Sequence, residues 1–192
     1  MSDRISLPHL LYQLLCDAQK LYGPRLDPSF TVDIETFAPV GRVAHASMRQ
    51  PDLTKRRYVI YVPMGTVETN LGTASFAIGH EVIHVLSCVG QPWTTFAEEG
   101  LGQVFAFDSA ARRGHWEISP RISSPYWRAE WLVSQLLRID PTAIKRVREV
   151  EPCLSKVTVD QLLVQCPNLD RRIAQQLTTR FPEGEDNVSQ PR

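Results

Sequence analysis

The sequence lacks an excess of charge of either sign, and it lacks a long apolar run. Its 21 lysine and arginine residues are matched by 21 aspartate and glutamate residues, so the formal net charge is zero. A field strong enough to hold a phosphate backbone or an anionic membrane is not expected from this balance. The apolar runs are far shorter than the roughly 20 residues that span a bilayer. We therefore expect neither a nucleic acid nor a membrane as a partner.

Cysteine is scarce, and no C-x-x-C pair occurs among Cys16, Cys88, Cys153 and Cys166. Small secreted scaffolds that depend on disulfides are much denser in cysteine. The first residues also lack the basic segment followed by an uninterrupted apolar stretch that marks a secretory signal. These absences predict reduced cysteines and a cytoplasmic location, although export by a leaderless route would give the same pattern.

The first part of the chain carries one helical pattern and then strand patterns. Leucines repeat at helical spacing from Leu7 to Leu21, and Gly23-Pro24 is a stop signal. Thr31–Glu35 alternates as a half-buried strand does, and Tyr58–Val62 is rich in β-branched and aromatic residues. Val40–Met48 is a weaker strand candidate. These patterns predict a helix followed by two or three strands.

From about Thr73 onward the patterns are helical. Thr95-Phe-Ala-Glu98 and Thr158-Val-Asp-Gln161 fit the capping box, in which an N-cap hydroxyl and an N3 carboxylate or amide satisfy backbone N–H groups. A sheet in the first half followed only by helices predicts an α+β fold. We expect one compact domain over residues 1–182, with a sheet lobe at about 24–93, a helical lobe at about 94–182 and a flexible polar tail at 183–192.

The residues that indicate chemistry are His80-Glu81-Val82-Ile83-His84. On a helix, positions i and i+4 lie on one face, so His80 and His84 can offer two imidazole nitrogens to one ion. Glu81 projects beside them, where it could take a proton from a metal-bound water. The histidine and glutamate content predicts roughly 0.007 chance occurrences of this pattern. The residues around the motif are uncharged, which is typical of a buried helix.

A catalytic zinc site needs a third protein ligand and an open position for water. Gly90 stands where the metzincin pattern requires its third histidine, so that class is excluded. Glu98 and Glu99 are the obvious glutamate candidates. Because Glu98 is the capping-box partner of Thr95, its carboxylate already has a task at the helix start. Glu99 has no such task and is the predicted ligand, with Glu98 as the alternative.

The expected heights of His84 and Glu99 on their helices agree with this assignment. We expect the helix that carries the histidines to end near Cys88, and the next helix to begin at Thr95. Each side chain then lies about 6 Å from the connecting loop, at about 1.5 Å per residue. In an antiparallel helix pair joined by a short loop, the two side chains are level with each other.

With these residues the sequence resembles the gluzincins, the zinc metallopeptidases of the thermolysin-like and aminopeptidase-like clan. The matching residues are His80, Glu81 and His84 of H-E-x-x-H, and Glu99 in Glu-Gly-Leu on the following helix. The resemblance implies a small zincin-like fold, in which a twisted sheet precedes the active-site helix, the glutamate helix and a helical lobe. It also implies one Zn²⁺ per chain, held by the two histidines and Glu99, and hydrolysis of peptide bonds.

The resemblance further implies roles for single side chains. Zinc would polarise the scissile carbonyl and lower the pKa of its water, while Glu81 acts as general base and then as proton donor. A donor from the helical lobe would stabilise the oxyanion, and Tyr126, at a predicted helix start, is preferred over His115. A peptide or protein substrate would pair with a sheet edge supplied by Tyr58–Val62 or Val40–Met48.

Two other functions compete with the peptidase hypothesis. A catalytically silent, protease-like module could keep the zinc site for a regulatory or protein-binding role. The intact Glu81 argues against it, because a binding module needs no general base. A helical interaction protein with an accidental motif would bind no zinc at all.

Overall fold

A computed structural model describes residues 6–37, 47–48, 54–64, 71–87, 93–114 and 124–182. Within these residues the chain is mixed and mostly helical, with a small sheet in its first half. This confirms the α+β class. The predicted tail at residues 183–192 lies outside the described part of the chain.

The first helix, α1, spans Leu7–Tyr22, as its leucine spacing predicts. Leu10 and Leu14 are fully buried on the face that the helix turns toward the core. The helix ends at Gly23, whose φ of 92° is accessible to glycine without strain. The backbone N–H of Gly23 donates to the Gln19 carbonyl and closes the last turn.

Three described strands form one sheet in the order β1-β3-β2. β1, Thr31–Phe37, pairs in parallel with β3, Arg57–Pro63, which also pairs antiparallel with β2, Ser47–Met48. The strand predictions for Thr31–Glu35 and Tyr58–Val62 are therefore confirmed. However, β3 is paired on both sides, so the prediction that Tyr58–Val62 could supply a substrate edge is wrong. β2 is the end of the other predicted segment, Val40–Met48, and could still supply a substrate edge. Residues 40–46 of that segment lie outside the described part.

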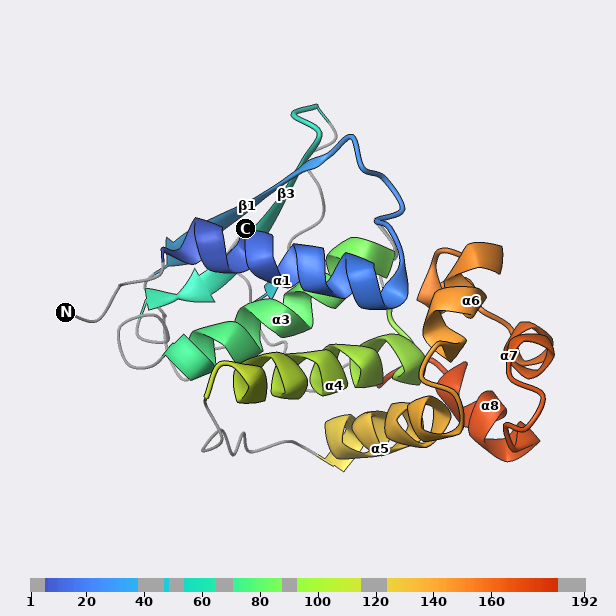
Figure 1. Cartoon of the computed structure of the whole chain (residues 1–192). Helices are drawn as coiled ribbons and strands as arrows, with labels where there is room; N and C mark the ends of the chain where they lie inside the picture. The colour runs from blue at the N-terminus through green and yellow to red at the C-terminus, as the bar shows by residue number, and fades with distance from the viewer. Residues whose placement is uncertain are drawn as a thin grey trace.

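Three long helices follow the sheet: α3 (Leu71–Ser87), α4 (Phe96–Arg112) and α5 (Ser124–Ile139). Figure 1 shows α1 lying across α3, with α4 and α5 stacked in turn on the other side of α3. The end of α3 at Ser87 and the N-cap of α4 at Thr95 agree with the boundaries expected from the sequence. The stack places the H-E-x-x-H helix in the middle of the molecule.

Small residues allow these helices to approach closely. A Cβ added at Gly79 of α3 would lie 3.2 Å from Ala106 Cα of α4. A Cβ added at Gly100 of α4 would lie only 2.2 Å from the carbonyl oxygen of Ala129 of α5. Side chains at these two positions would separate the helices, so the close contacts of α4 with both neighbours depend on glycine.

Short helical segments complete the described chain: α6 (Ala143–Val150), the 3₁₀ segment η1 (Leu154–Lys156), α7 (Val159–Gln165) and α8 (Arg171–Leu177). α7 begins with the predicted capping box, in which both hydrogen bonds between Thr158 and Gln161 are present. Figure 1 shows this group at one end of the helix stack, and η1 and α8 contact α4 there. Among the described residues, no helix combines the length and apolar character needed to cross a membrane.

A buried arginine ties the end of α3 to these segments. Arg148 of α6 is 5% exposed and donates hydrogen bonds to the carbonyls of Leu86, Tyr22 and Gly23. These carbonyls lie at or just beyond the C-terminal ends of α3 and α1, where the helix dipole is negative and favours a cation. Burial lowers the pKa of Arg148 to about 10, so the side chain stays charged at neutral pH.

The cysteines differ from the sequence-based expectation. Cys153 is disulfide-bonded, whereas Cys16 and Cys166 are free thiols. The prediction that all cysteines are reduced is therefore wrong for Cys153. Cys88, the remaining cysteine of the sequence, lies outside the described part.

Candidate metal centre

α3 and α4 bring the predicted ligands together. His80 and His84 lie one turn apart on α3, and Glu99 lies in the first turn of α4. His84 faces Glu99, and His80, one turn earlier on α3, faces Gln103, one turn later on α4. This register is that of an antiparallel helix pair. His84 and Glu99 stand level with each other, as the loop spacing predicts.

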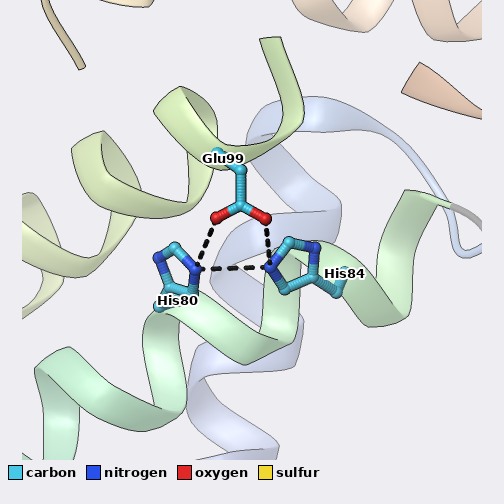
Figure 2. A group of neighbouring side chains, drawn as sticks. All are labelled: His80, His84 and Glu99. Carbon is cyan, nitrogen blue, oxygen red and sulfur yellow. Dashed lines mark hydrogen bonds and ion pairs between the residues drawn. The ribbon is translucent and has the colours of Figure 1, made fainter. Parts of the chain in front are cut away.

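The three side chains present their ligand atoms to a common point (Figure 2). The Nε2 atoms of His80 and His84 are 3.3 Å apart. His80 Nε2 lies 3.2 Å from Glu99 Oε2, and His84 Nε2 lies 3.6 Å from Glu99 Oε1. In a tetrahedral zinc site with bonds of about 2.0–2.1 Å, neighbouring ligand atoms are about 3.3 Å apart. The group therefore fits a metal ion in both donor type and spacing.

Glu99 is held in place without having all its hydrogen-bonding capacity satisfied. The residue is 7% exposed, and Thr94 Oγ1 donates a 2.8 Å hydrogen bond to its Oε1. Oε2 is buried, and its polar neighbour is His80 Nε2 at 3.2 Å, a contact that is a hydrogen bond only while that nitrogen carries a proton. When His80 offers its Nε2 lone pair instead, the buried oxygen needs another positive partner. A bound cation would be that partner.

Charges at the site are coupled between histidines and carboxylates. Burial alone would lower the pKa of His84. Three carboxylates raise it instead, those of Glu99, Glu98 and Glu81. Burial alone would raise the pKa of Glu99, but the neighbouring His84 and His80 lower it. The surroundings of the two Nε2 atoms are therefore strongly anionic, and a divalent cation is the ligand that this charge favours.

Glu98 has a different task from the one predicted. The Thr95 hydroxyl accepts a hydrogen bond from the Glu98 backbone N–H, so Thr95 is the N-cap. The Glu98 carboxylate, however, accepts hydrogen bonds from His84 Nδ1 at 2.8 Å and from Ser155 Oγ. The prediction that this carboxylate serves the helix start is wrong, because two buried donors engage it. Glu98 lies behind His84 and is not one of the three clustered ligand groups.

His80 has its own neighbours on α4. Gln103 Nε2 lies 3.3 Å from His80 Nδ1, and a Cβ added at Gly102 would lie 2.8 Å from the same nitrogen. The sequence-based reasoning missed Gln103, although its position four residues after Glu99 places it on the same face of α4. It also missed Ser155, which carries no comparable signal because it is 57 residues from Glu98.

Glu81 and Tyr126, the predicted catalytic residues, lie at the same site. Glu81 is 7% exposed. The ring centroid of Tyr126 is 6.1 Å from that of His80. Burial raises the pKa of the Tyr126 phenol, and the charges of Glu99 and Glu81 raise it further, so the hydroxyl stays protonated and able to donate. His115, the alternative donor, lies outside the described part of the chain.

The chain matches no protein-family model, no curated protein and no solved structure. The function therefore has to be inferred from the residues, distances and charges of the site itself.

Proposed function

We propose that this protein is a zinc-dependent peptidase with a small zincin-like fold of the gluzincin type. The observation that carries the proposal is the triangle formed by His80 Nε2, His84 Nε2 and the Glu99 carboxylate, at the spacing of zinc ligands. The H-E-x-x-H helix adds a buried Glu81 beside it. This combination supports one Zn²⁺ per chain.

The residues around the triangle would then carry the proton transfers. A zinc ion held there supplies Lewis-acid polarisation of a carbonyl and activation of water. Glu81 would accept a proton as the nucleophile forms and deliver it to the leaving amine. Tyr126, kept protonated by its raised pKa, would donate a hydrogen bond to the developing oxyanion.

The proposed substrate is an extended segment of a peptide or protein. Among the described strands, β2 ends the sheet order on the side of β3 away from β1, and it contacts α3. Its outer edge could pair with an added strand next to the helix that carries the histidines. The zero net charge gives no support to a nucleic-acid or membrane partner.

The cytoplasmic location predicted from the sequence conflicts with the disulfide at Cys153, because disulfides are typical of oxidising compartments. Titration of the thiols in protein that is unfolded without a reductant distinguishes a cytoplasmic protein from a protein of an oxidising compartment. Four reactive thiols would support a cytoplasmic protein, and fewer than four would support an oxidising compartment.

Metal analysis of the purified protein tests the proposed function. We expect about one zinc per chain in the wild type. Glu99→Ala should lose the metal, whereas Glu149→Ala, at an exposed position on α6, should keep it. The zinc-loaded wild type should cleave members of a random-sequence, fluorescence-quenched peptide library.

Two results would contradict the peptidase proposal. Stoichiometric zinc binding without any cleavage would favour the catalytically silent regulatory or binding module. Absence of zinc after careful handling would mean that the motif is accidental.

A further inference from the structure

The two histidines of the site are held by different partners at their second ring nitrogen. His84 Nδ1 donates a 2.8 Å hydrogen bond to Glu98 Oε1, whereas His80 Nδ1 faces the Gln103 amide at 3.3 Å. A carboxylate can only accept hydrogen bonds, but an amide can accept through its oxygen or donate through its nitrogen. The two imidazoles are therefore constrained differently.

Glu98 selects one tautomer of His84. The residue is 2% exposed, and Ser155 Oγ donates to its second oxygen, so the carboxylate is held in one orientation. Because this carboxylate accepts from Nδ1, His84 must carry a proton there. Its Nε2 then faces Glu99 and is the nitrogen available to a metal.

Gln103 can accept either tautomer of His80, because its amide can turn its nitrogen or its oxygen toward Nδ1. With the amide Nε2 facing Nδ1, as in this structure, Nδ1 accepts and the proton of a neutral His80 lies on Nε2, 3.2 Å from Glu99 Oε2. In this arrangement Gln103 Oε1 is buried and has no hydrogen-bond partner among the described residues. The arrangement suits a site without metal, because a protonated Nε2 has no lone pair to offer.

We propose that Gln103 is a positioning residue whose side-chain amide rotates when the site takes up a metal. The inference rests on the proposed zinc site. To coordinate a metal, His80 must free the Nε2 lone pair, so its proton moves from Nε2 to Nδ1 by exchange with water. A rotation of the amide by about 180° then presents Oε1 to the Nδ1–H. This gives the unpartnered oxygen a donor, while His84 keeps its Nδ1 proton throughout.

Zinc affinity of paired Gln103 variants tests the role of the amide. Gln103→Met removes both hydrogen-bonding groups and should weaken zinc binding roughly 10–100-fold. Gln103→Glu offers only acceptors, which favours the metal-binding tautomer of His80, so it should bind zinc at least as tightly as the wild type. A merely structural role would make both variants lose affinity alike.

Thr158→Ala is the matched control for stability. It removes the N-cap of α7, which packs on α6 and α8, so it should lower the melting temperature and leave the zinc Kd unchanged. Comparing melting temperatures of the metal-free proteins shows whether a Gln103 variant has lost affinity merely by losing structure.

Nitrogen-15 NMR of the histidine imidazoles locates the ring protons directly. The measurement uses the wild-type protein, so it does not depend on a variant that folds. We expect His80 to be protonated at Nε2 without metal and at Nδ1 with zinc, and His84 to be protonated at Nδ1 in both states. An unchanged His80 tautomer, or equal zinc Kd values for Gln103→Met and the wild type, would overturn the inference and leave the zinc site standing. A wild type that binds no zinc would instead overturn the proposed function and the inference together.

Discussion

The interface between α3 and α4 and the helices α6, α7 and α8 bury different kinds of side chain. The first encloses carboxylate, imidazole and amide groups, those of Glu81, His84, Glu98, Glu99 and Gln103. In α6, α7 and α8 the buried side chains are apolar except for Arg148, whose hydrogen bonds reach several backbone carbonyls. One region thus holds groups suited to chemistry, and the other holds groups suited to packing.

This difference has a thermodynamic consequence. Buried ionisable groups contribute less to stability than apolar groups of similar size, unless every atom finds a partner. In the α3–α4 interface, Gln103 Oε1 accepts no hydrogen bond among the described residues, and Glu99 Oε2 depends on the protonation of the His80 ring for one. We therefore expect substitutions of these polar residues to change metal binding or turnover, and substitutions in the C-terminal helices to change stability alone.

The largest expected effect is on turnover, at Glu81. Glu81→Gln keeps the size of the side chain and removes the base, so kcat should fall by about 10²–10⁴. The zinc content should stay near that of the wild type, because Glu81 is not one of the three ligand groups. Zinc analysis and peptide cleavage on the same preparation check this, with Glu149→Gln as the control. Equal loss of metal and activity would show that Glu81 is misassigned.

The next effect is expected at Tyr126. Tyr126→Phe removes only the hydroxyl, so kcat should fall by about 10²–10³ while the zinc content and melting temperature stay unchanged. Steady-state kinetics beside a thermal melt measure both. If Tyr126→Phe keeps full turnover and His115→Ala loses it, the role of oxyanion donor passes to His115.

Alanine substitutions at two glycines of α4 are expected to have different effects, one on helix packing and the other on metal binding. An alanine Cβ at Gly100 meets the Ala129 backbone, so Gly100→Ala should destabilise the fold by about 1–3 kcal/mol, although alanine is the better helix former. An alanine Cβ at Gly102 meets the His80 ring, so Gly102→Ala should weaken zinc binding more than it lowers stability. Denaturant unfolding and zinc titration of both variants check this, and the reverse pattern would contradict it.

The smallest effect is expected beside α6, at Asp140. Hydrogen bonds from Arg146 and Thr142 lower the pKa of Asp140 from its ordinary 3.8 to about 2. Because the folded pKa lies below the unfolded value, the stabilisation is complete above the unfolded pKa and is lost as the pH falls through the folded one. Asp140→Asn should therefore lower the melting temperature slightly at neutral pH, and by a smaller amount at about pH 2, where the folded carboxyl is partly protonated. Thermal melts of both proteins at both pH values check this. An equal drop in melting temperature at the lower pH would argue against it. The zinc content should not change.

Local patterns were enough to predict much of the fold and the ligand group. The leucine spacing predicted α1, and alternation and β-branched residues predicted β1 and β3. The N-cap at Thr95 set the height of Glu99 on α4, and the stop signals after α3 set that of His84. These predictions succeeded because each depends on hydrogen bonds and side-chain periodicity within one or two turns of the chain.

Glu98 shows where local reasoning failed. Its sequence context fits a capping box, and the backbone half of that box is present. The carboxylate is nevertheless buried between His84 and Ser155, and a buried ion pair with an imidazole outweighs a bond to one backbone N–H at a helix end. The competing partners come from α3 and η1, so nothing within α4 could have revealed them.

By itself, the sequence determined the helix and strand patterns, the two histidines on one helical face and the preference for Glu99 over Glu98. Only the tertiary structure decided that β3 is the central strand, that Glu98 supports His84, and that Gln103 faces His80. The physical reason is the range of the interactions. Caps and helical faces are set by neighbours within a few residues, whereas the partner of a buried polar side chain is set by which helices meet and in which register.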